Sequence, residues 1–219
     1  MSAIAALTAR RFFSFRALAP LGWLCATVVL AWVARENGGA PVFLRGSFAP
    51  LILPLLVFSL VELALGPSTL KTHASLSTAF GGSPAKPIAS VICTVASIAA
   101  LHSGTLGLVG ALVARGDSIS VALTTFACAL AGASYAVWFL YGATMGKRGG
   151  GRHIVLGLDF IIGSGAGAGA FVFPRAHLRA CLGGHGALGV HGAGAIGMLV
   201  AIALSLSGLT LMRARTWRS

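Results

Sequence analysis

The sequence predicts an all-α protein embedded in a membrane, folded as a single bundle of six transmembrane helices. Of its 219 residues, 57% are hydrophobic and only 9% are charged, whereas a soluble domain carries about 25% charged residues. Six apolar segments approach the roughly 20 residues that cross the hydrocarbon of a bilayer. Short basic clusters lie between them, as is typical of segments that border a membrane. We therefore expect one transmembrane domain over residues 1–219.

The first element is expected ahead of the first span. Segment 1–17 contains "RRFFSFRAL", a basic and aromatic-rich sequence that favours an amphipathic helix lying at the membrane surface. A charged flank that only orients the next helix is the alternative interpretation. The six predicted spans follow in order, at 18–33, 48–65, 88–114, 119–144, 154–173 and 193–212.

The distribution of basic residues predicts the orientation of the chain. If the N-terminus is cytoplasmic, eleven Lys and Arg residues lie on its side of the membrane, and five lie opposite, namely Arg35, Arg45, Arg115, Arg175 and Arg179. Cytoplasmic segments carry such an excess, so we expect a multi-pass protein of the inner (plasma) membrane with both termini cytoplasmic. The clusters do not gather on one solvated face, which argues against nucleic acid as a partner.

Three polar residues inside predicted spans are candidates for a functional role, because such groups are costly in lipid. Glu62 and Asp159 are the only carboxylates there, and both are expected near the cytoplasmic boundary. An ion pair with Lys71, Lys147, Arg148 or Arg152 is one interpretation, and ion or proton coupling is another. His102, near the middle of the third span, fits a packing residue, a haem ligand or a proton relay.

Two further motifs resemble cofactor sites without matching them. The stretch "HLRACLGGH" spaces His177, Cys181 and His185 along one helical face, but Gly183 and Gly184 interrupt the helix and no fourth ligand is near. The stretch "GATMGKRGGG" departs from a phosphate-binding loop in both spacing and residue types. We therefore expect no metal, no cofactor and no enzymatic activity in this chain.

Alternating glycines mark the fifth predicted span. In "GSGAGAGAF", Gly163 and Gly167 form one small-xxx-small pair, and Gly165 and Gly169 form a second. Such pairs let two helix backbones approach closely in a membrane. The expected partner is another helix of the same chain or the same span of a second protomer.

A polar stretch between the second and third spans predicts a short helix. Ser68 can cap the first N–H groups, and Gly81 with Gly82 ends the helix. Leu70 and Ala74 give it a modest apolar side, and the other side is rich in hydroxyl groups. A helix that docks on a soluble partner is one interpretation, and an interfacial loop without a partner is the alternative.

The order of these elements resembles the membrane subunits of type 2 ABC exporters. "RRFFSFRAL" resembles that family's elbow helix, and "GPSTLKTHASLSTAFGGSPAKP" is similar to its cytoplasmic coupling helix between spans two and three. "FVFPRAHLRACLGGHGALGVHGAG" stands where the family has a re-entrant hairpin between spans five and six, and "LMRARTWRS" resembles its basic tail. The coupling stretch departs from the family by having no acidic residue.

The resemblance implies a permease subunit that lines half of an export pathway in the lipid bilayer. Two such subunits, identical or homologous, would face each other, and each would dock a cytoplasmic ABC ATPase that binds ATP and Mg. The implied docking residues are Leu70, Lys71, His73, Leu76 and Phe80.

Three other classes stay open from the sequence. A haem-binding electron-transfer subunit would use His102, and an ion-coupled secondary transporter would use Glu62 or Asp159. A small structural subunit of a larger membrane complex would use none of the three.

Overall fold

A computed structural model describes residues 18–66, 70–79, 82–115, 121–146 and 149–217, and those residues form helices and turns without a strand. The side chains of residues 18–20, 73, 76, 77 and 79 lie outside this description. The helical elements, in chain order, are α2 (Leu18–Glu36), α3 (Ala40–Phe43), η2 (Leu44–Ile52), α4 (Leu53–Leu65), α5 (Leu70–Ala79), α6 (Ala85–Val113), α7 (Val121–Gly142), α8 (Gly151–Ile161), η4 (Ala168–Val172), α9 (Pro174–Cys181), η5 (Ala187–Gly189) and α10 (Gly192–Thr216).

Four helical runs in the described residues are long and apolar enough to cross a membrane. They are the run that begins at Ala40 and includes α3, η2 and α4, and the helices α6, α7 and α10. With 29 residues, α6 is about 44 Å long, which exceeds a hydrocarbon core of about 30 Å. The six-span arrangement stays a prediction, because α2 and α8 are not among these four. The predicted elbow helix at 1–17 lies outside the described residues.

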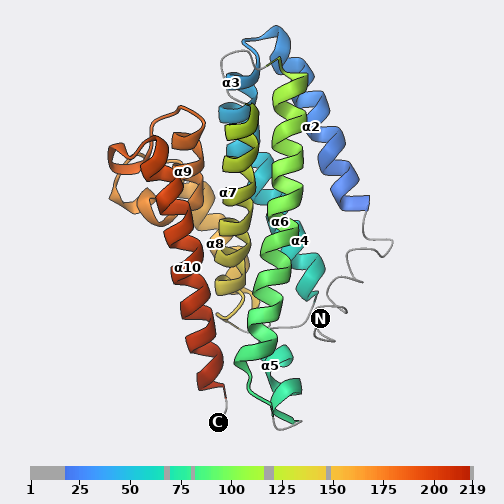
Figure 1. The fold of residues 1–219 in the computed structure, drawn as a ribbon, viewed down its shortest axis with the longest axis vertical. Helices are drawn as coiled ribbons and strands as arrows, with labels where there is room; N and C mark the ends of the chain where they lie inside the picture. Colours follow the sequence, from blue (N-terminus) through green and yellow to red (C-terminus); the bar gives the residue numbers. More distant parts are fainter. Residues whose placement is uncertain (1–17, 67–69, 80–81, 116–120, 147–148, 218–219) are drawn as a thin grey trace.

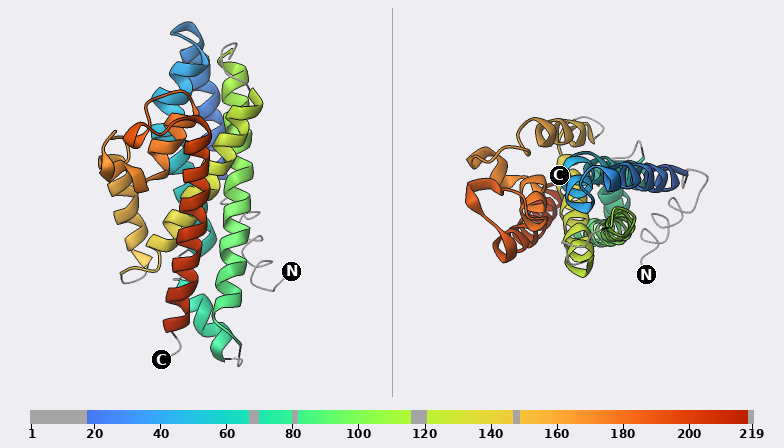
Figure 2. Two further views of the ribbon diagram at one scale, coloured as in Figure 1. Left: turned by 60° about the vertical axis from the view of Figure 1, so that its left-hand side comes forward. Right: turned by 90° about the horizontal axis from the view of Figure 1, so that it is seen from above.

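The long helices lie side by side along one axis, with α6 and α7 packed together at the centre (Figure 1). α10 packs on α7, and α2 packs on α6. α5 and the C-terminal end of α10 lie at one end of the bundle, and α3 lies at the other (Figures 1 and 2). We call the first of these the α5 end.

Prolines and glycines determine the shape of the N-terminal run. Gly39 closes the end of α2 with a positive φ and donates its N–H to the carbonyl of Ala34 at 2.8 Å. Pro50, which has no N–H, lies inside η2, a π-helix where the N–H of Leu53 reaches back to the carbonyl of Phe48. The wider turn accommodates a proline that an α-helix would reject, so the helical path continues from α3 into α4.

The fifth predicted span, 154–173, is not one continuous helix. α8 ends at Ile161, and the chain then turns through Gly163 into η4 and α9. The four alternating glycines lie in this turn and in η4, so they do not form the predicted small-xxx-small face of a helix. The physical reason is the low helix propensity of glycine, which at every second position outweighs the apolar character of the segment.

The close packing of α6 against α7 depends on glycines in both helices. A Cβ at Gly132 would lie 2.7 Å from the carbonyl oxygen of Ala99 and would collide with the Ser103 side chain. A Cβ at Gly107 would lie 2.7 Å from the sulfur of Cys128. The two helices can approach this closely only because a side chain is missing on each of them.

This contact predicts that Gly132→Ala destabilises the protein by about 1–3 kcal/mol, since the added methyl group overpacks the α6–α7 contact. Gly208→Ala is the matched control, because nothing lies within 4 Å of the Cβ position of Gly208 in α10. Thermal unfolding of the two purified variants in detergent measures the difference. Equal midpoints for the two variants would contradict the close approach.

Candidate functional site

α8 is amphipathic with its charged side turned inward. Its buried residues include Arg152 (4% exposed) and Asp159 (0%), while Ile154 (66%) and Ile161 (79%) are exposed. A water-facing helix has the opposite arrangement. The exposed apolar side of α8 is therefore suited to contact lipid or another protein, and its charges contact other helices of this chain.

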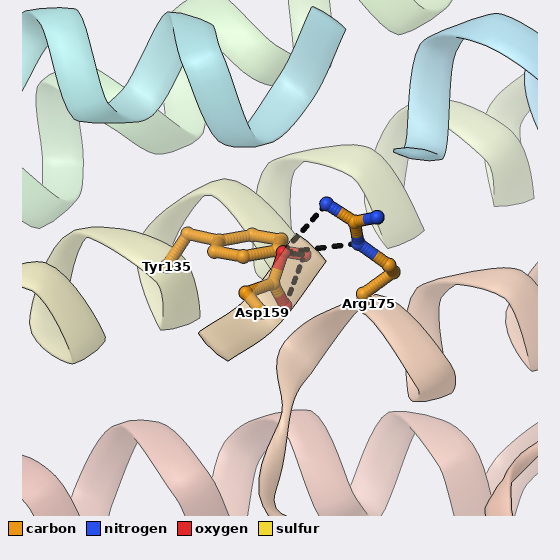
Figure 3. A network of polar contacts seen from close by, with 3 residues as sticks. All are labelled: Tyr135, Asp159 and Arg175. Carbon is orange, nitrogen blue, oxygen red and sulfur yellow. Dashed lines mark hydrogen bonds and ion pairs between the residues drawn. The ribbon is translucent and has the colours of Figure 1, made fainter. Parts of the chain in front are cut away.

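The most buried charge, Asp159, pairs with Arg175 at the start of α9. The Asp159 Oδ2 atom accepts from Nε of Arg175 at 2.9 Å, and Nη2 of Arg175 lies 2.8 Å from it. The hydroxyl group of Tyr135, from α7, lies 3.2 Å from both carboxylate oxygens. Figure 3 shows the three side chains converging from three helices. We call Tyr135, Asp159 and Arg175 the buried triad.

The surroundings of the buried triad leave little space around the carboxylate. The Arg175 guanidinium lies 4.3 Å from the centre of the Phe160 ring, and the Tyr135 ring stacks on Phe139 at 5.8 Å. A Cβ at Gly163 would lie 2.6 Å from Oδ1 of Asp159, so only glycine fits there. Both oxygens of Asp159 already accept hydrogen bonds, and this arrangement makes the triad a rigid connection between α7, α8 and α9.

α9 holds the chain segments around it through three further polar contacts. Arg179 donates to the carbonyl of Ser164 at 2.5 Å, and a ring nitrogen of His177 lies 2.6 Å from the carbonyl of Phe171. At the other end of α9, Nε of Arg45 donates to the carbonyl of Leu182 at 2.7 Å. The connection from α8 to α10 is thus a fixed structure packed against α7 and α10.

A second ion pair joins the start of α8 to the end of α4. Nε of Arg152 lies 2.6 Å from Oε1 of Glu62, and its Nη2 donates to the carbonyl of Gly66 at 3.2 Å. His153 lies 3.6 Å from the same oxygen of Glu62. Gly66 ends α4 with a positive φ, so Arg152 binds the free carbonyl end of that helix, where a cation is favourable.

The structure separates the two carboxylates that the sequence places at one boundary. Glu62 pairs with Arg152, one of its expected partners. Asp159 pairs with Arg175, which was expected on the outer side of the membrane, and not with Lys71 or Arg152. The predicted partner of Asp159 is wrong because α8 ends at Ile161, before the predicted end of the span at 173, and the chain folds back to place α9 against it. Two other expected partners, Lys147 and Arg148, lie outside the described residues.

The histidine and cysteine candidates do not assemble a site. Among the described residues, no group of three or more His, Cys, Asp or Glu side chains lies close enough to hold a metal ion. His177 is fully buried against the Phe171 carbonyl, and burial raises the pKa of the Cys181 thiol to about 11, so the thiol stays protonated at neutral pH. His102 bonds through Nδ1 to the carbonyl of Ile98 in its own helix at 2.9 Å.

The short helix predicted between the second and third spans is present as α5. Leu70 is fully buried, Ala74 is 2% exposed, and Lys71, Thr72, Ser75 and Thr78 are exposed. The hydroxyl group of Ser75 bonds to the carbonyl of Thr72 within the helix. The side chains of His73 and Leu76 lie outside the description, as does Phe80. α5 is therefore anchored on its apolar side and presents a polar side outward.

Two residues of the buried triad, Tyr135 and Arg175, were not predicted as site residues. Arg175 follows Pro174 in a segment whose other basic residues are His177 and Arg179, and it lies 16 positions after Asp159. Two opposite charges that each lie among apolar residues are the signal that could have paired them. Tyr135 gives no such signal, because an aromatic residue in an apolar helix is common.

Comparisons with known protein families, with curated protein sequences and with solved structures found no match to this chain.

The buried triad predicts a characteristic pattern of stability. Asp159→Leu alone should cost about 3–5 kcal/mol, because it leaves the Arg175 charge buried without a partner. The double variant Asp159→Leu/Arg175→Met should be more stable than the sum of the two single losses implies. Denaturant titration of the purified variants measures these losses.

The matched control is Glu36→Gln, since the Glu36 side chain is 72% exposed and its contact with Arg35 is 3.9 Å long. A change of no more than about 1 kcal/mol is expected for such a surface pair. Strictly additive losses at Asp159 and Arg175 would show that the two charges do not interact.

Proposed function

We propose that this protein is the membrane subunit of an ATP-driven exporter of the type 2 ABC class. In this proposal two such subunits form the export pathway in the plasma membrane, and separate cytoplasmic ATPases bind and hydrolyse ATP with Mg. The chain itself carries out no catalysis. The observation that carries the proposal is α5, a short helix between two apolar helical runs that is anchored by its apolar side and is polar on its exposed side.

The position of α5 supports a docking role. α5 lies beyond the end of α4 and packs on α6, so a force applied to it is transmitted to that long helix (Figure 1). Buried Leu70 and Ala74 fix the helix to the bundle, and its exposed side carries Lys71, Ser75 and Thr78. A partner that moves α5 would therefore move the bundle.

The charges at the α5 end support a cytoplasmic location for it. Lys71, Lys86, Arg213 and Arg215 are exposed there, and among the described residues Arg45 and Arg115 are the arginines exposed at the opposite, α3 end. Exposed basic residues beside apolar helices are typical of the cytoplasmic side of a membrane. Both chain termini are then cytoplasmic in this proposal.

The segment between α8 and α10 supports the same class. Its position between the last two apolar segments is that of the family's re-entrant hairpin, and it starts with Pro174 at the first turn of α9. The buried triad and the Arg45 contact hold it against the bundle. We propose that it closes the outer part of the pathway.

One observation favours a second candidate, an ion-coupled secondary transporter. Asp159 is a fully buried carboxylate in a chain with apolar helices, the usual location of a coupling group. Its two oxygens are already engaged by Arg175 and Tyr135, which suits a structural connection better than a site that binds and releases an ion. Transport without ATP that responds to pH or to an ion gradient would favour this candidate.

The proposal predicts the side of the membrane on which α5 lies. Ser75→Cys, in a variant whose four native cysteines are replaced, should react with a membrane-impermeant maleimide in inside-out vesicles and remain unlabelled in intact cells. Ser75 is exposed, so the reagent reaches it without unfolding the helix. Labelling of Ser75→Cys in intact cells would place α5 outside and end the proposal.

The proposal also predicts that α5 holds an ATPase. The protein purified from native membranes in mild detergent should carry a subunit with a phosphate-binding loop and ATPase activity. Ser75→Trp should lower the amount of that subunit at least about tenfold, since a bulky side chain on the exposed side blocks close docking. Leu112→Trp is the matched control, because Leu112 is 59% exposed on α6, far from α5. Equal recovery of the ATPase with both variants would count against docking at α5.

A further inference from the structure

A groove runs between α7, η4 and α10 on the side of the bundle. Its volume is about 420 Å³, within the range of sites that hold small ligands. Trp138 and Tyr141 line it from α7, Val172 lines it from η4, and Met198 and Ile202 line it from α10. Its lining is almost entirely apolar, and two of its three walls are helices long and apolar enough to cross a membrane.

A cation lies next to the groove toward the α5 end. The guanidinium of Arg213, in the last turns of α10, lies 5.9 Å from the centre of the ring of Tyr141, a lining residue. Ser205, another lining residue, is eight positions before Arg213, which corresponds to about 12 Å along the helix. An apolar slot with a cation one or two turns beyond it matches a molecule with an apolar chain and an anionic head.

No carboxylate among the described residues supplies that anion. Among the described residues, Glu62 pairs with Arg152, Asp159 pairs with Arg175, and Glu36 lies beside Arg35. Arg213 is exposed, and none of the carboxylates that the structure describes pairs with it. A second copy of this chain carries a net charge of +12, so it is a poor occupant for a groove bordered by a cation.

We propose that the groove binds one acyl chain of an anionic phospholipid, whose phosphate contacts Arg213. The guanidinium fork is suited to a phosphate, and the Tyr141 ring holds it in place by a cation–π contact. The chain of the lipid lies along Ser205 and Ile202 toward Val172. This inference requires only that the apolar helices lie in a bilayer, and it does not depend on the proposed export function.

The groove carries its own reporter, because Trp138 lines it. The experiment uses the full chain with Trp23, Trp32 and Trp217 replaced by Phe, so that Trp138 is the sole tryptophan. The protein is reconstituted in phosphatidylcholine vesicles that contain brominated phosphatidylglycerol or brominated phosphatidylcholine at equal mole fraction. Bromine quenches tryptophan fluorescence on contact, and quenching curves give the relative affinity of each lipid for the groove.

Phosphatidylglycerol should bind about fivefold more tightly than phosphatidylcholine, which corresponds to one basic residue acting on an anionic lipid. Arg213→Gln should reduce that ratio to about one. Arg215→Gln is the matched control, an exposed arginine two positions away without the contact to Tyr141, and it should leave the ratio unchanged. Equal affinities of the two lipids in the protein with Arg213 would overturn the proposal, as would equal effects of the two arginine variants.

A bulky side chain placed in the groove tests whether the acyl chain lies there. Ala201→Phe, at a lining residue, should lower the quenching of Trp138 by both lipids at least about threefold, and Leu204→Phe, exposed on α10 outside the groove, should not. Circular dichroism and gel filtration check that Ala201→Phe folds. If it does not, the ratio of the two lipid affinities in the protein with Ala201 still tests the proposal. Absence of quenching by either lipid would overturn the proposal and would indicate that a protein segment covers the groove.

Discussion

The buried ion pair between Asp159 and Arg175 is the constraint on which the C-terminal half of the structure depends. Two charges removed from water need a close partner of opposite charge, and Asp159 and Arg175 approach to 2.8 Å, so the helices that carry them have little freedom relative to each other. Because Asp159 is near the end of α8 and Arg175 is at the start of α9, the chain between them must turn within 15 residues. Gly163 makes that turn compatible with the pair, since a side chain there would occupy the space next to the carboxylate.

The same pair explains why α8 faces the bundle with its charged side. An 11-residue helix is about 16 Å long, too short to cross a bilayer alone, and its outer side is Ile154, Leu158 and Ile161. Its charges are compensated within the protein, by Glu62 at one end and Arg175 at the other. α8 can therefore lie beside lipid without exposing a charge to it. α7 supports α8 directly, because Gly142 lets the backbone around Arg152 approach.

Much of the helical framework follows from the sequence, and the fine arrangement of the last third does not. Runs of apolar residues predict α6, α7 and α10 to within a few residues. The capping residue Ser68 and the terminating glycines Gly81 and Gly82 predict a helix in the polar stretch that contains α5. Hydropathy alone extends the fifth span to 173, since alanine and glycine are apolar by composition, yet alternate glycines do not hold a helix. The pair Asp159–Arg175 was missed because the hydropathy pattern predicted one continuous span over 154–173, which places the two residues on opposite sides of the membrane. The pair Glu62–Arg152 was expected from the shared boundary.

The hydrogen bond from Arg45 to the Leu182 carbonyl has a consequence for biogenesis. It joins residues 137 positions apart in the chain, so the arginine is made long before its acceptor exists. At a synthesis rate of about 5–20 residues per second, Arg45 waits roughly 7–27 s for this contact. During that interval the π-helix η2, which contains Pro50, lacks the packing that α9 later provides, so the N-terminal run reaches its final environment only after α9 has been made.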